Sequence, residues 1–301
     1  MNFKKVLTII VTYNRVKLLN RCIRAVQNQT YKYNELLVIN NSSTDNTEDY
    51  LREQNINFVT QPNSGSAGGW NRGMEEGWKG NFDMVWMMDD DGFPDENALR
   101  KLVPYLNDLT NNNIAVSSLV VKENKKEEFV FPLPKLNSSG FPILFSLKRK
   151  YNFINELGHI ITYPYIHPFN GTLIDLKKSK EIGNIDTSYF MFGDETDYFY
   201  RLKKMGIVST VLEALHYHPD VNKRKIEKKK VFYFIRNTII INHLYLDQPY
   251  LRNFFTIAVT LSRIKNQDGF LSIFSYLFGK NRRFFYPAII DGLRNRKNNL
   301  Y

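Results

Sequence analysis

The sequence predicts an α/β fold of the doubly wound, Rossmann-like kind, in which helices flank a mostly parallel sheet. Residues 6–11 (VLTIIV) and 84–88 (MVWMM) are unbroken apolar runs, which are typical of strands buried on both faces of a parallel sheet. Segments with helical spacing alternate with strand-like runs along the first third of the chain, and this order favours parallel strands joined by helices. The 301 residues suffice for one large α/β domain and an appended region.

In the first expected helix, apolar positions recur every three or four residues, which places the single cysteine, Cys22, in the core. Ser43, Thr44 and Asp45 precede the second helix and can cap it. Pro94 is expected at the start of the fourth helix, where a residue without an N–H is tolerated. We expect strands at residues 6–11, 35–40, 57–61 and 84–88, and helices at residues 18–26, 49–54, 70–77 and from residue 94 onward.

The middle of the chain is less regular. Residues 122–160 lack clear periodicity and contain three prolines, so we expect an insertion or a mobile loop near the functional site. A strand at 170–175, helices at 177–182 and 194–205, and a strand at 207–212 follow, with Gly206 ending the second helix. After residue 220 the composition changes to basic, aromatic helical stretches. We therefore expect an α/β domain over residues 1–220 and a helical region over residues 221–301.

The charge balance is strongly basic, with 41 Lys and Arg against 30 Asp and Glu, a net charge of +11. This suggests an anionic partner: nucleic acid, acidic lipid or a phosphorylated small molecule. One cysteine excludes an intramolecular disulfide framework and a cysteine-based zinc site. No apolar run approaches the roughly 20 residues that cross a bilayer, and residues 1–15 lack the apolar core of a secretory signal. We expect a cytoplasmic or membrane-surface protein.

Three adjacent carboxylates, Asp89, Asp90 and Asp91, follow the apolar run 84–88. Open α/β sheets bind ligands at the carboxyl ends of their strands, which is where this triplet is expected. Mg²⁺ and Mn²⁺ prefer oxygen ligands and offset the repulsion between carboxylates. Because alternate residues of an extended chain point to the same side, Asp89 and Asp91 can share one ion. The alternative is a solvated acidic turn that caps the following helix.

Residues 63–73 (NSGSAGGWNRG) form a glycine-rich loop that enters a helix. Such loops allow the backbone to approach a sugar or a phosphate, and a helix N-terminus attracts anions. The loop lacks the lysine of a P-loop and does not match the GxGxxG fingerprint. It is a candidate binding loop, and a plain tight turn is the alternative.

Two further groups are candidates for chemistry. Residues 194–197 (DETD) open a helix. Their carboxylates either cap that helix or supply a general base for a sugar hydroxyl. His216 and His218 are two residues apart after a strand, so they share one side of the extended chain. One of them can complete a metal site that begins with the aspartates.

Basic and aromatic residues interleave along the C-terminal region. Residues 223–236 and 280–297 carry clusters of Lys and Arg beside Phe and Tyr. This pattern fits an anionic membrane surface and also fits single-stranded nucleic acid. A solvated helix face is the third interpretation.

Taken together and in order, these motifs resemble the nucleotide-sugar-dependent family 2 glycosyltransferases with the GT-A fold, especially bacterial galactofuranosyl- and rhamnosyltransferases of polysaccharide assembly. The similarity covers about residues 5–240. Residues 11–15 (VTYNR) resemble the opening strand and turn, residues 40–45 (NNSSTD) the nucleotide-binding segment, and residues 63–73 and 89–91 the sugar-nucleotide loop and the metal motif. Asn170-Gly171 and residues 193–198 with Arg201 resemble the acceptor-side block and the catalytic motif, and residues 233–237 (YFIRN) a Y-x-x-R-N element without an assigned role.

The resemblance implies a role for each matching residue. Asp89 and Asp91 would bind Mn²⁺ or Mg²⁺, and His216 or His218 would be the third protein ligand, with His216 preferred because it directly follows an apolar stretch. Asp90 would reach the ribose or the sugar. Glu195 would be the catalytic base, with Asp194 beside it. The nucleoside of a UDP- or TDP-sugar would be held by Thr12, Asn14, Arg15, Asn41 and Asp45, and its sugar side by Asn63, Gly65, Gly69 and Asn71.

The function that the resemblance implies is an inverting, metal-dependent glycosyl transfer in cell-surface polysaccharide synthesis, such as that of a capsule. Galactofuranose from UDP-galactofuranose is the first expectation, and rhamnose from TDP-rhamnose is the alternative. The acceptor would be lipid-diphosphate-linked or an oligosaccharide, and the basic C-terminal region would bind the inner face of the cell membrane.

A nucleic-acid-binding protein is the alternative from another class. It leaves the three aspartates unexplained, because they would repel phosphate, so we expect no nucleic-acid partner.

Overall fold

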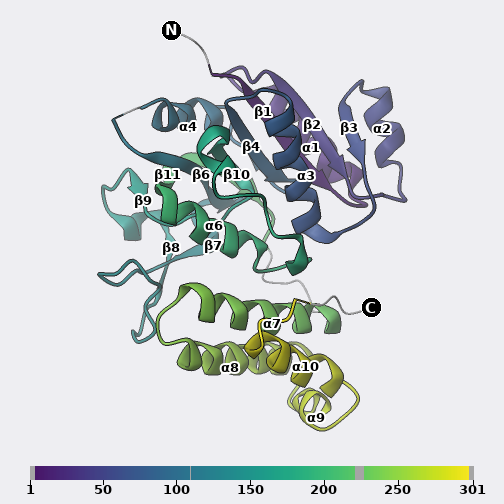
Figure 1. Ribbon diagram of the computed structural model, residues 1–301, viewed down its shortest axis with the longest axis vertical. Helices are drawn as coiled ribbons and strands as arrows, with labels where there is room; N and C mark the ends of the chain where they lie inside the picture. The colour runs from purple at the N-terminus through teal and green to yellow at the C-terminus, as the bar shows by residue number, and fades with distance from the viewer. Residues whose placement is uncertain (1–3, 109, 221–226, 298–301) are drawn as a thin grey trace. The chain divides into compact units, whose positions relative to one another are not determined.

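The computed structural model describes residues 4–108, 110–220 and 227–297 (Figure 1). The chain divides into two compact units, one formed by Met1–Ile185 with Tyr198–Asp220 and the other by Asp186–Asp197 with Val221–Tyr301. The predicted α/β class is confirmed, with a large sheet and flanking helices in the first unit and further helices in the second. Among the residues described, no helix has both the length and the apolar character needed to cross a membrane.

The sheet of the first unit is mixed. Parallel pairing joins its first four long strands, and the next strand runs antiparallel to both of its neighbours. The parallel part places the carboxyl ends of its strands at one edge, since Thr12 pairs with Asn40 and Val11 with Asp89. The path through the sheet is β3 (Asn57–Thr60), β2 (Glu35–Asn40), β1 (Val6–Thr12), β4 (Met84–Asp89), β10 (Asn170–Asp175), β6 (Asn113–Lys122), β11 (Ile207–His218) and β5 (Phe93–Pro94).

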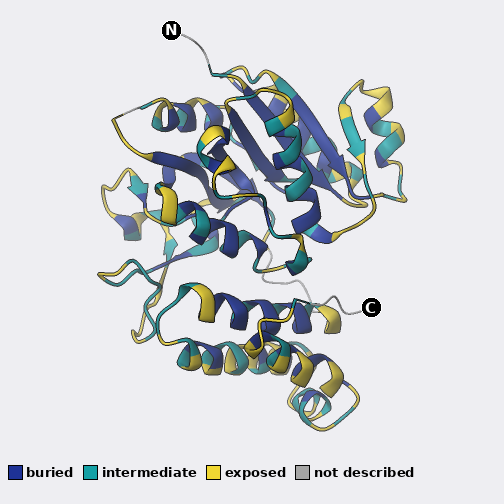
Figure 2. Ribbon diagram, viewed as in Figure 1, coloured by how far each residue is buried: buried dark blue, intermediate teal, exposed yellow. Residues whose placement is uncertain are grey.

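Alternate residues of the central strands face helices on opposite sides of the sheet. Ile10 and Trp86 share a buried core with α1 (Val16–Gln27) and α4 (Ala98–Asn107). On the other face, α3 (Gly65–Lys79) packs so closely that a Cβ at Gly73 would lie 2.8 Å from Ile9. The strands are therefore buried on both faces, as their unbroken apolar runs predicted (Figure 2). This unit also contains α2 (Thr47–Glu53), the short α5 (Leu176–Lys180) and the part of α6 (Asp194–Met205) from Tyr198 onward.

The prediction for Pro94 is wrong. Pro94 belongs to β5, in which Phe93 and Pro94 pair with Tyr217 and His216 of β11, and α4 begins only at Ala98. A proline is compatible with an edge strand because it needs no hydrogen-bond partner for an N–H. The acidic triplet is therefore followed by a short strand and not by a helix.

The expectation of an insertion or a mobile loop at residues 122–160 is wrong for the parts of this segment that form strands. Strand β7 (Lys125–Pro134) pairs with β6 and with β8 (Lys150–Phe153), and a 3-10 turn (Ile154–Leu157) and strand β9 (Thr162–Tyr163) follow. Phe129 and Leu133 are buried in a local core with Leu119 and Tyr163. This apolar surface fixes the segment, although its prolines conceal the strand pattern in the sequence.

The second unit is built from α7 (Lys228–Tyr245), α8 (Pro249–Asp268), α9 (Leu271–Leu277) and α10 (Arg282–Leu293). Phe232, Ile239 and Ala288 belong to its buried core. The same unit includes the segment Asp186–Asp197, with a 3-10 turn at Thr187–Tyr189 and the beginning of α6 (Asp194–Met205). The predicted boundary at residue 220 stays a prediction.

Candidate functional site

The acidic triplet lies at the carboxyl edge of β4 and is tied to the end of β1. Thr12 Oγ1 donates to Asp90 Oδ2 at 2.6 Å, and Arg15 Nη1 donates to Asp90 Oδ1 at 3.0 Å and to Asp91 Oδ2 at 2.9 Å. Asp90 is 1% exposed, and this burial raises its pKa to about 6 although the Arg15 charge opposes the shift. Asp90 therefore anchors the Arg15 guanidinium at the edge where strands of this kind bind ligands.

Asp91 and His218 place two atoms that can act as metal ligands next to each other. His218 Nε2 lies 3.0 Å from Asp91 Oδ1, and His218 Nδ1 lies 2.7 Å from the carbonyl oxygen of Pro219. A carbonyl only accepts, so Nδ1 carries a proton, and in a neutral imidazole Nε2 then presents a lone pair to the carboxylate. Two acceptors that face each other need a proton or a cation between them. Metal-binding histidines commonly donate their second ring N–H to a backbone carbonyl in this way.

His216 lies in a different environment. It is fully buried, both of its ring nitrogens are without a hydrogen-bond partner among the described residues, and burial lowers its pKa to about 3. A Cβ at Gly92 would lie 2.3 Å from His216 Nε2, and one at Gly171 would lie 3.1 Å from Nδ1. The preference for His216 as partner of the aspartates therefore finds no support in the geometry, which pairs Asp91 with His218.

The loops after β1 and β2 are bound to each other through Asn14. Its Oδ1 accepts the N–H groups of Thr44 at 2.6 Å and Asp45 at 3.3 Å, and its own N–H donates to Ser43 Oγ at 2.9 Å. Asp45 accepts the N–H of Val16 at 3.2 Å. Asn14 and Asp45, both predicted to hold a nucleoside, thus join the two loops at the carboxyl edge of the sheet.

The glycine-rich loop reaches the same edge. Asn63 Oδ1 accepts the N–H of Gly65 at 3.0 Å, and Asn41 Nδ2 donates to the Gly65 carbonyl at 3.2 Å. A Cβ at Gly69 would lie 2.4 Å from Val11, so only glycine allows this approach of α3 to β1. Asn71 points elsewhere, because its Nδ2 donates to the carbonyl of Ile185 at 2.8 Å.

In the second unit, Asp194 and Glu195 stand in the first turn of α6. Asp194 is buried and Glu195 is half-buried. Burial and the neighbouring Asp194 charge raise the pKa of Glu195 from 4.5 to about 8. A carboxylate with such a pKa is a stronger base than an ordinary glutamate and is suited to accept a proton near neutral pH.

Residues 8–166 match the family model described as glycosyl transferase family 2. The chain belongs to this family. Galactofuranosyltransferase GlfT1 of Mycolicibacterium smegmatis is 28% identical to this family 2 glycosyltransferase over 220 residues, 71% of this chain and 70% of the relative. Glycosyltransferase GlyA of Streptococcus pneumoniae is 29% identical over 118 residues, 36% of this chain and 16% of the relative.

Solved structures share the fold of this family 2 glycosyltransferase. GalNAc-T7 with UDP, GalNAc and Mn²⁺ superimposes with a TM-score of 0.61 at 15% identity, over 96% of this chain and 57% of that chain. S. aureus TarS 1–349 superimposes with a TM-score of 0.57 at 14% identity, over 97% of this chain and 82% of that chain. The predicted GT-A fold is confirmed, and the chain spans little more than half the length of the first of these structures.

The predicted metal ligands of this family 2 glycosyltransferase are only partly brought together. Within the described residues, no group of three or more His, Cys, Asp or Glu side chains stands in an arrangement that could hold a metal ion. The 3.0 Å between Asp91 Oδ1 and His218 Nε2 equals the separation of about 3 Å between adjacent ligands of an octahedral ion with bonds of about 2.1 Å. These two residues fit a divalent ion, and the full set of Asp89, Asp91, His216 and His218 stays a prediction.

Arg21 is a residue of this edge that the sequence did not indicate. Its Nη2 donates to the backbone carbonyl of Asp91 at 2.8 Å, and its guanidinium lies 4.5 Å from the centre of the Phe93 ring and pairs with Glu123 at 2.7 Å. Its spacing gave no signal, because six residues after Arg15 is about 1.7 helical turns, which places the two arginines on different sides of a helix. Arg21 fixes the backbone at the end of the triplet.

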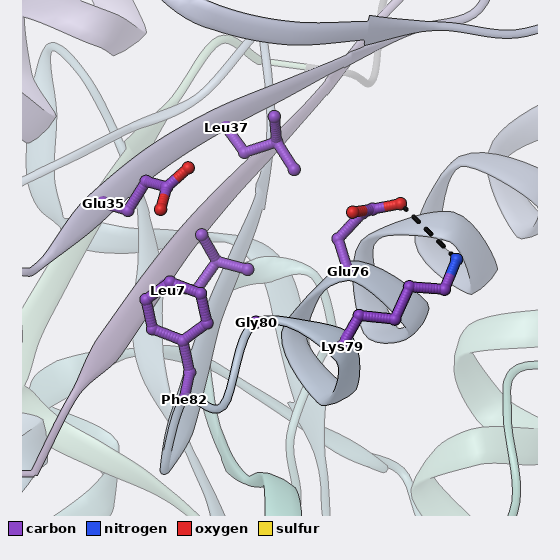
Figure 3. A pocket seen from close by; sticks show the side chains of 7 residues that line it. All are labelled: Leu7, Glu35, Leu37, Glu76, Lys79, Gly80 and Phe82. Carbon is purple, nitrogen blue, oxygen red and sulfur yellow. Dashed lines mark ion pairs between the residues drawn. The ribbon is translucent and has the colours of Figure 1, made fainter.

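A separate hollow lies at the opposite, amino end of the strands (Figure 3). Its volume is about 210 Å³, and the figure shows Glu35, Glu76 and Lys79 around it, with an ion pair between Lys79 and Glu76. None of the predicted site residues lines it. Ligands of open α/β sheets bind at the carboxyl edge, so the hollow is distinct from the candidate site.

Proposed function

We propose that this family 2 glycosyltransferase performs an inverting, metal-dependent transfer of galactofuranose from UDP-galactofuranose. The similarity to galactofuranosyltransferase GlfT1 supports galactofuranose as the transferred sugar. The observation that carries the metal dependence is the 3.0 Å approach of Asp91 Oδ1 to His218 Nε2, a pair of atoms between which a proton or a cation must lie. TDP-rhamnose is the alternative donor. Membership of this family also favours transfer chemistry over nucleic-acid binding.

On the donor side, Asp89, Asp91 and His218 would hold Mn²⁺ or Mg²⁺. When bound, such an ion neutralises the diphosphate and stabilises the charge of the departing UDP. A solved structure of the same fold was crystallised with UDP and Mn²⁺. The nucleoside would be held at the joined loops by Thr12, Asn14, Arg15, Asn41 and Asp45, and the sugar side by Asp90, Asn63, Gly65 and Gly69.

On the acceptor side, Glu195 would remove the proton from the attacking hydroxyl group. That oxygen forms the new bond to the anomeric carbon while the bond from this carbon to the UDP oxygen breaks and its electron pair leaves with UDP. One displacement on the opposite face inverts the configuration and needs no covalent intermediate. The raised pKa of Glu195 supports this assignment. The acceptor would be a lipid-diphosphate-linked or oligosaccharide chain in cell-surface polysaccharide synthesis.

Calorimetry with a panel of donors tests the proposed function. We expect UDP-galactofuranose to bind in the presence of Mn²⁺ and to bind at least about tenfold more weakly after chelation, because the ion neutralises the diphosphate. TDP-rhamnose and UDP-glucose are the comparison ligands. Equal affinity with and without the ion would contradict the metal dependence. Tighter binding of TDP-rhamnose than of UDP-galactofuranose would select the alternative donor.

We also propose that the second unit binds the anionic inner face of the cell membrane. Phe270, Phe274 and Phe278 are exposed around α9, and their rings contact in sequence at 5.8 Å and 6.3 Å. Exposed Lys280, Arg282 and Arg283 follow. An aromatic ridge beside cationic side chains is the pattern with which a helix lies in the surface of an anionic bilayer.

Vesicle flotation tests this membrane contact. We expect strong recovery with vesicles containing an anionic lipid, weak recovery with neutral vesicles, and about a fivefold weaker affinity for each cation removed at Arg282 or Arg283. The variant Phe274→Ser/Phe278→Ser should lose recovery because its apolar ridge is gone. Phe145→Ser removes an equally exposed aromatic from the first unit and should behave as the wild type. Equal recovery with neutral and anionic vesicles would contradict the proposal.

A further inference from the structure

The segment that leads into α6 has an unusual backbone. Phe190, Phe192 and Gly193 have φ angles of +63°, +58° and +88°. Glycine adopts such left-handed conformations freely, but for each bulky aromatic residue they cost on the order of 1–3 kcal/mol. Such a conformation persists only where surrounding contacts impose it, so the segment must be held from outside.

Two buried polar side chains of α7 hold it. Asn237 Nδ2 lies 3.1 Å, 2.8 Å and 2.6 Å from the carbonyl oxygens of Tyr189, Met191 and Phe192. Arg236 Nη2 lies 3.2 Å from the Tyr189 carbonyl, and Arg236 Nε donates to Asn237 Oδ1 at 2.7 Å. Because that oxygen accepts from Arg236, the amide must present its nitrogen to the segment. Arg236 thus sets the orientation in which Asn237 binds three carbonyls.

The first position of the Y-x-x-R-N element, Tyr233, contacts the same segment. The ring of Tyr233 stacks on Phe190, with 5.3 Å between centroids and an angle of 28°. Tyr233, Arg236 and Asn237 therefore all bind the segment 188–192, one through a ring and two through backbone carbonyls. This shared target explains the spacing of the element, since positions i, i+3 and i+4 lie on one face of a helix.

Stability alone does not account for this arrangement. Arg236 and Asn237 are both completely buried, and burial lowers the pKa of the Arg236 guanidinium. Apolar side chains of similar size commonly stabilise such a position at least as well, and buried charge is retained in some proteins because it specifies one conformation. Here the conformation specified is the path of residues 188–193.

That path determines where the catalytic motif begins. A Cβ at Gly193 would lie 2.9 Å from Asn237 Cβ, so α7 and the segment touch directly before Asp194. The carbonyl of Gly193 accepts the N–H of Asp197 at 2.7 Å, which closes the first turn of α6 around Glu195. The hydroxyl of Tyr245 on α7 donates to Asp197 Oδ1 at 2.7 Å. Contacts from α7 therefore fix both sides of the turn that carries Glu195.

We propose that Arg236 and Asn237 are positioning residues for glycosyl transfer, which hold the strained segment 188–193 so that Glu195 stands ready in the first turn of α6. The inference rests on the assignment of Glu195 as the base under the proposed function. It assigns a role to the Y-x-x-R-N element of this chain.

Asn237→Ala tests the positioning role. We expect kcat to fall by on the order of 10²-fold, the loss associated with a misplacement of about 1 Å, while donor affinity measured by calorimetry keeps its wild-type value. Hydrogen exchange of the Asp197 amide should become faster, because the Gly193 carbonyl that accepts its hydrogen bond is no longer held in place. Asn242→Ala is the matched control, since Asn242 is a buried asparagine of the same helix whose Nδ2 donates to Asn253 Oδ1 at 2.9 Å. It should lose stability but retain kcat.

A second substitution tests the strain itself. Glycine adopts a positive φ at no steric cost, so Phe192→Gly in the Asn237→Ala background should give a kcat at least about tenfold higher than that of Asn237→Ala alone. Unchanged Asp197 exchange in Asn237→Ala overturns the inference, and so does an equal loss of kcat in Asn242→Ala. Faster exchange with unchanged kcat also overturns it. If Glu195→Gln then leaves kcat unchanged too, the failure lies in the assignment of the base.

Discussion

Replacement of Glu195 by glutamine is expected to lower kcat by about 10²- to 10⁴-fold, the usual contribution of one general base. Glutamine has nearly the same shape but cannot accept the proton of the attacking hydroxyl. The donor should bind as before, because the nucleoside and metal residues belong to the other unit of the chain. Steady-state kinetics with a synthetic acceptor and donor calorimetry measure the two effects separately.

The pH profile provides an independent check. Glu195 acts as a base only when it is deprotonated, so the wild-type rate should rise as the pH increases through about 8. The folded chain binds this proton more tightly than the unfolded chain, whose glutamate has an ordinary pKa of 4.5. The Glu195 carboxyl therefore lowers stability progressively as the pH rises from about 4.5 to 8. Glu195→Gln should remove this loss, so its inactivity at pH 8 cannot be attributed to unfolding.

Asp194→Asn distinguishes the two carboxylates of the pair. We expect it to lower the pKa of Glu195, since the Asp194 charge contributes to the raised value, and to shift the rising limb of the pH profile downward. Wild-type turnover in Glu195→Gln, combined with inactivity of Asp194→Asn, would transfer the role of base to Asp194.

The second large effect is expected for Asp91→Asn, which should weaken Mn²⁺-dependent donor binding by at least about 100-fold. The substitution removes the negative charge that faces His218 Nε2 and also the charge that binds Arg15. An amide is a weak ligand for a hard divalent ion, so the diphosphate would lose its counter-ion. Titration of Mn²⁺ alone, followed by electron paramagnetic resonance, separates metal affinity from donor affinity.

Two histidine variants serve as matched controls for Asp91. His218→Gln is expected to reproduce the loss of Mn²⁺ affinity, because His218 Nε2 lies 3.0 Å from Asp91 Oδ1. His216→Gln should retain the affinity, because no hydrogen bond of the His216 ring nitrogens is found among the described residues. Unchanged Mn²⁺ affinity in Asp91→Asn would refute the metal role. A loss of Mn²⁺ affinity confined to His216→Gln would instead identify His216 as the ligand, as the sequence first favoured.

Strands buried on both faces were predictable because their apolar character is continuous and local. The expected bounds of β2 and β10 match the structure, and so do those of α6, which begins with acidic residues and ends before Gly206. Strand β5 was not predictable, since Phe93 and Pro94 pair with a strand more than a hundred residues later in the chain. Strand β7 likewise depends on packing against β6 and β8, and its own period is interrupted by prolines.

The location of the acidic triplet followed from one rule, that open α/β sheets bind ligands where strands end. Its partners did not follow from that rule. His216 and His218 are alternate residues of β11, so the sequence does not show which of them lies at the level of Asp91. In the structure it is His218. The hydrogen bonds from Arg236 and Asn237 to residues 188–192 could not be predicted from the sequence either. Their acceptors are backbone carbonyls, which every residue type has.

The burial of Cys22 has a practical consequence for spectroscopy. Its side chain is completely buried within the core beneath β1 and β4, and this burial raises the pKa of the thiol well above its ordinary value. The nucleophilic thiolate is therefore scarce and inaccessible to a maleimide reagent. Because the sequence contains no second cysteine, an engineered one at exposed Leu147 or Phe278 would carry a fluorophore or spin label with little background. Cys22 therefore does not need to be replaced before labelling.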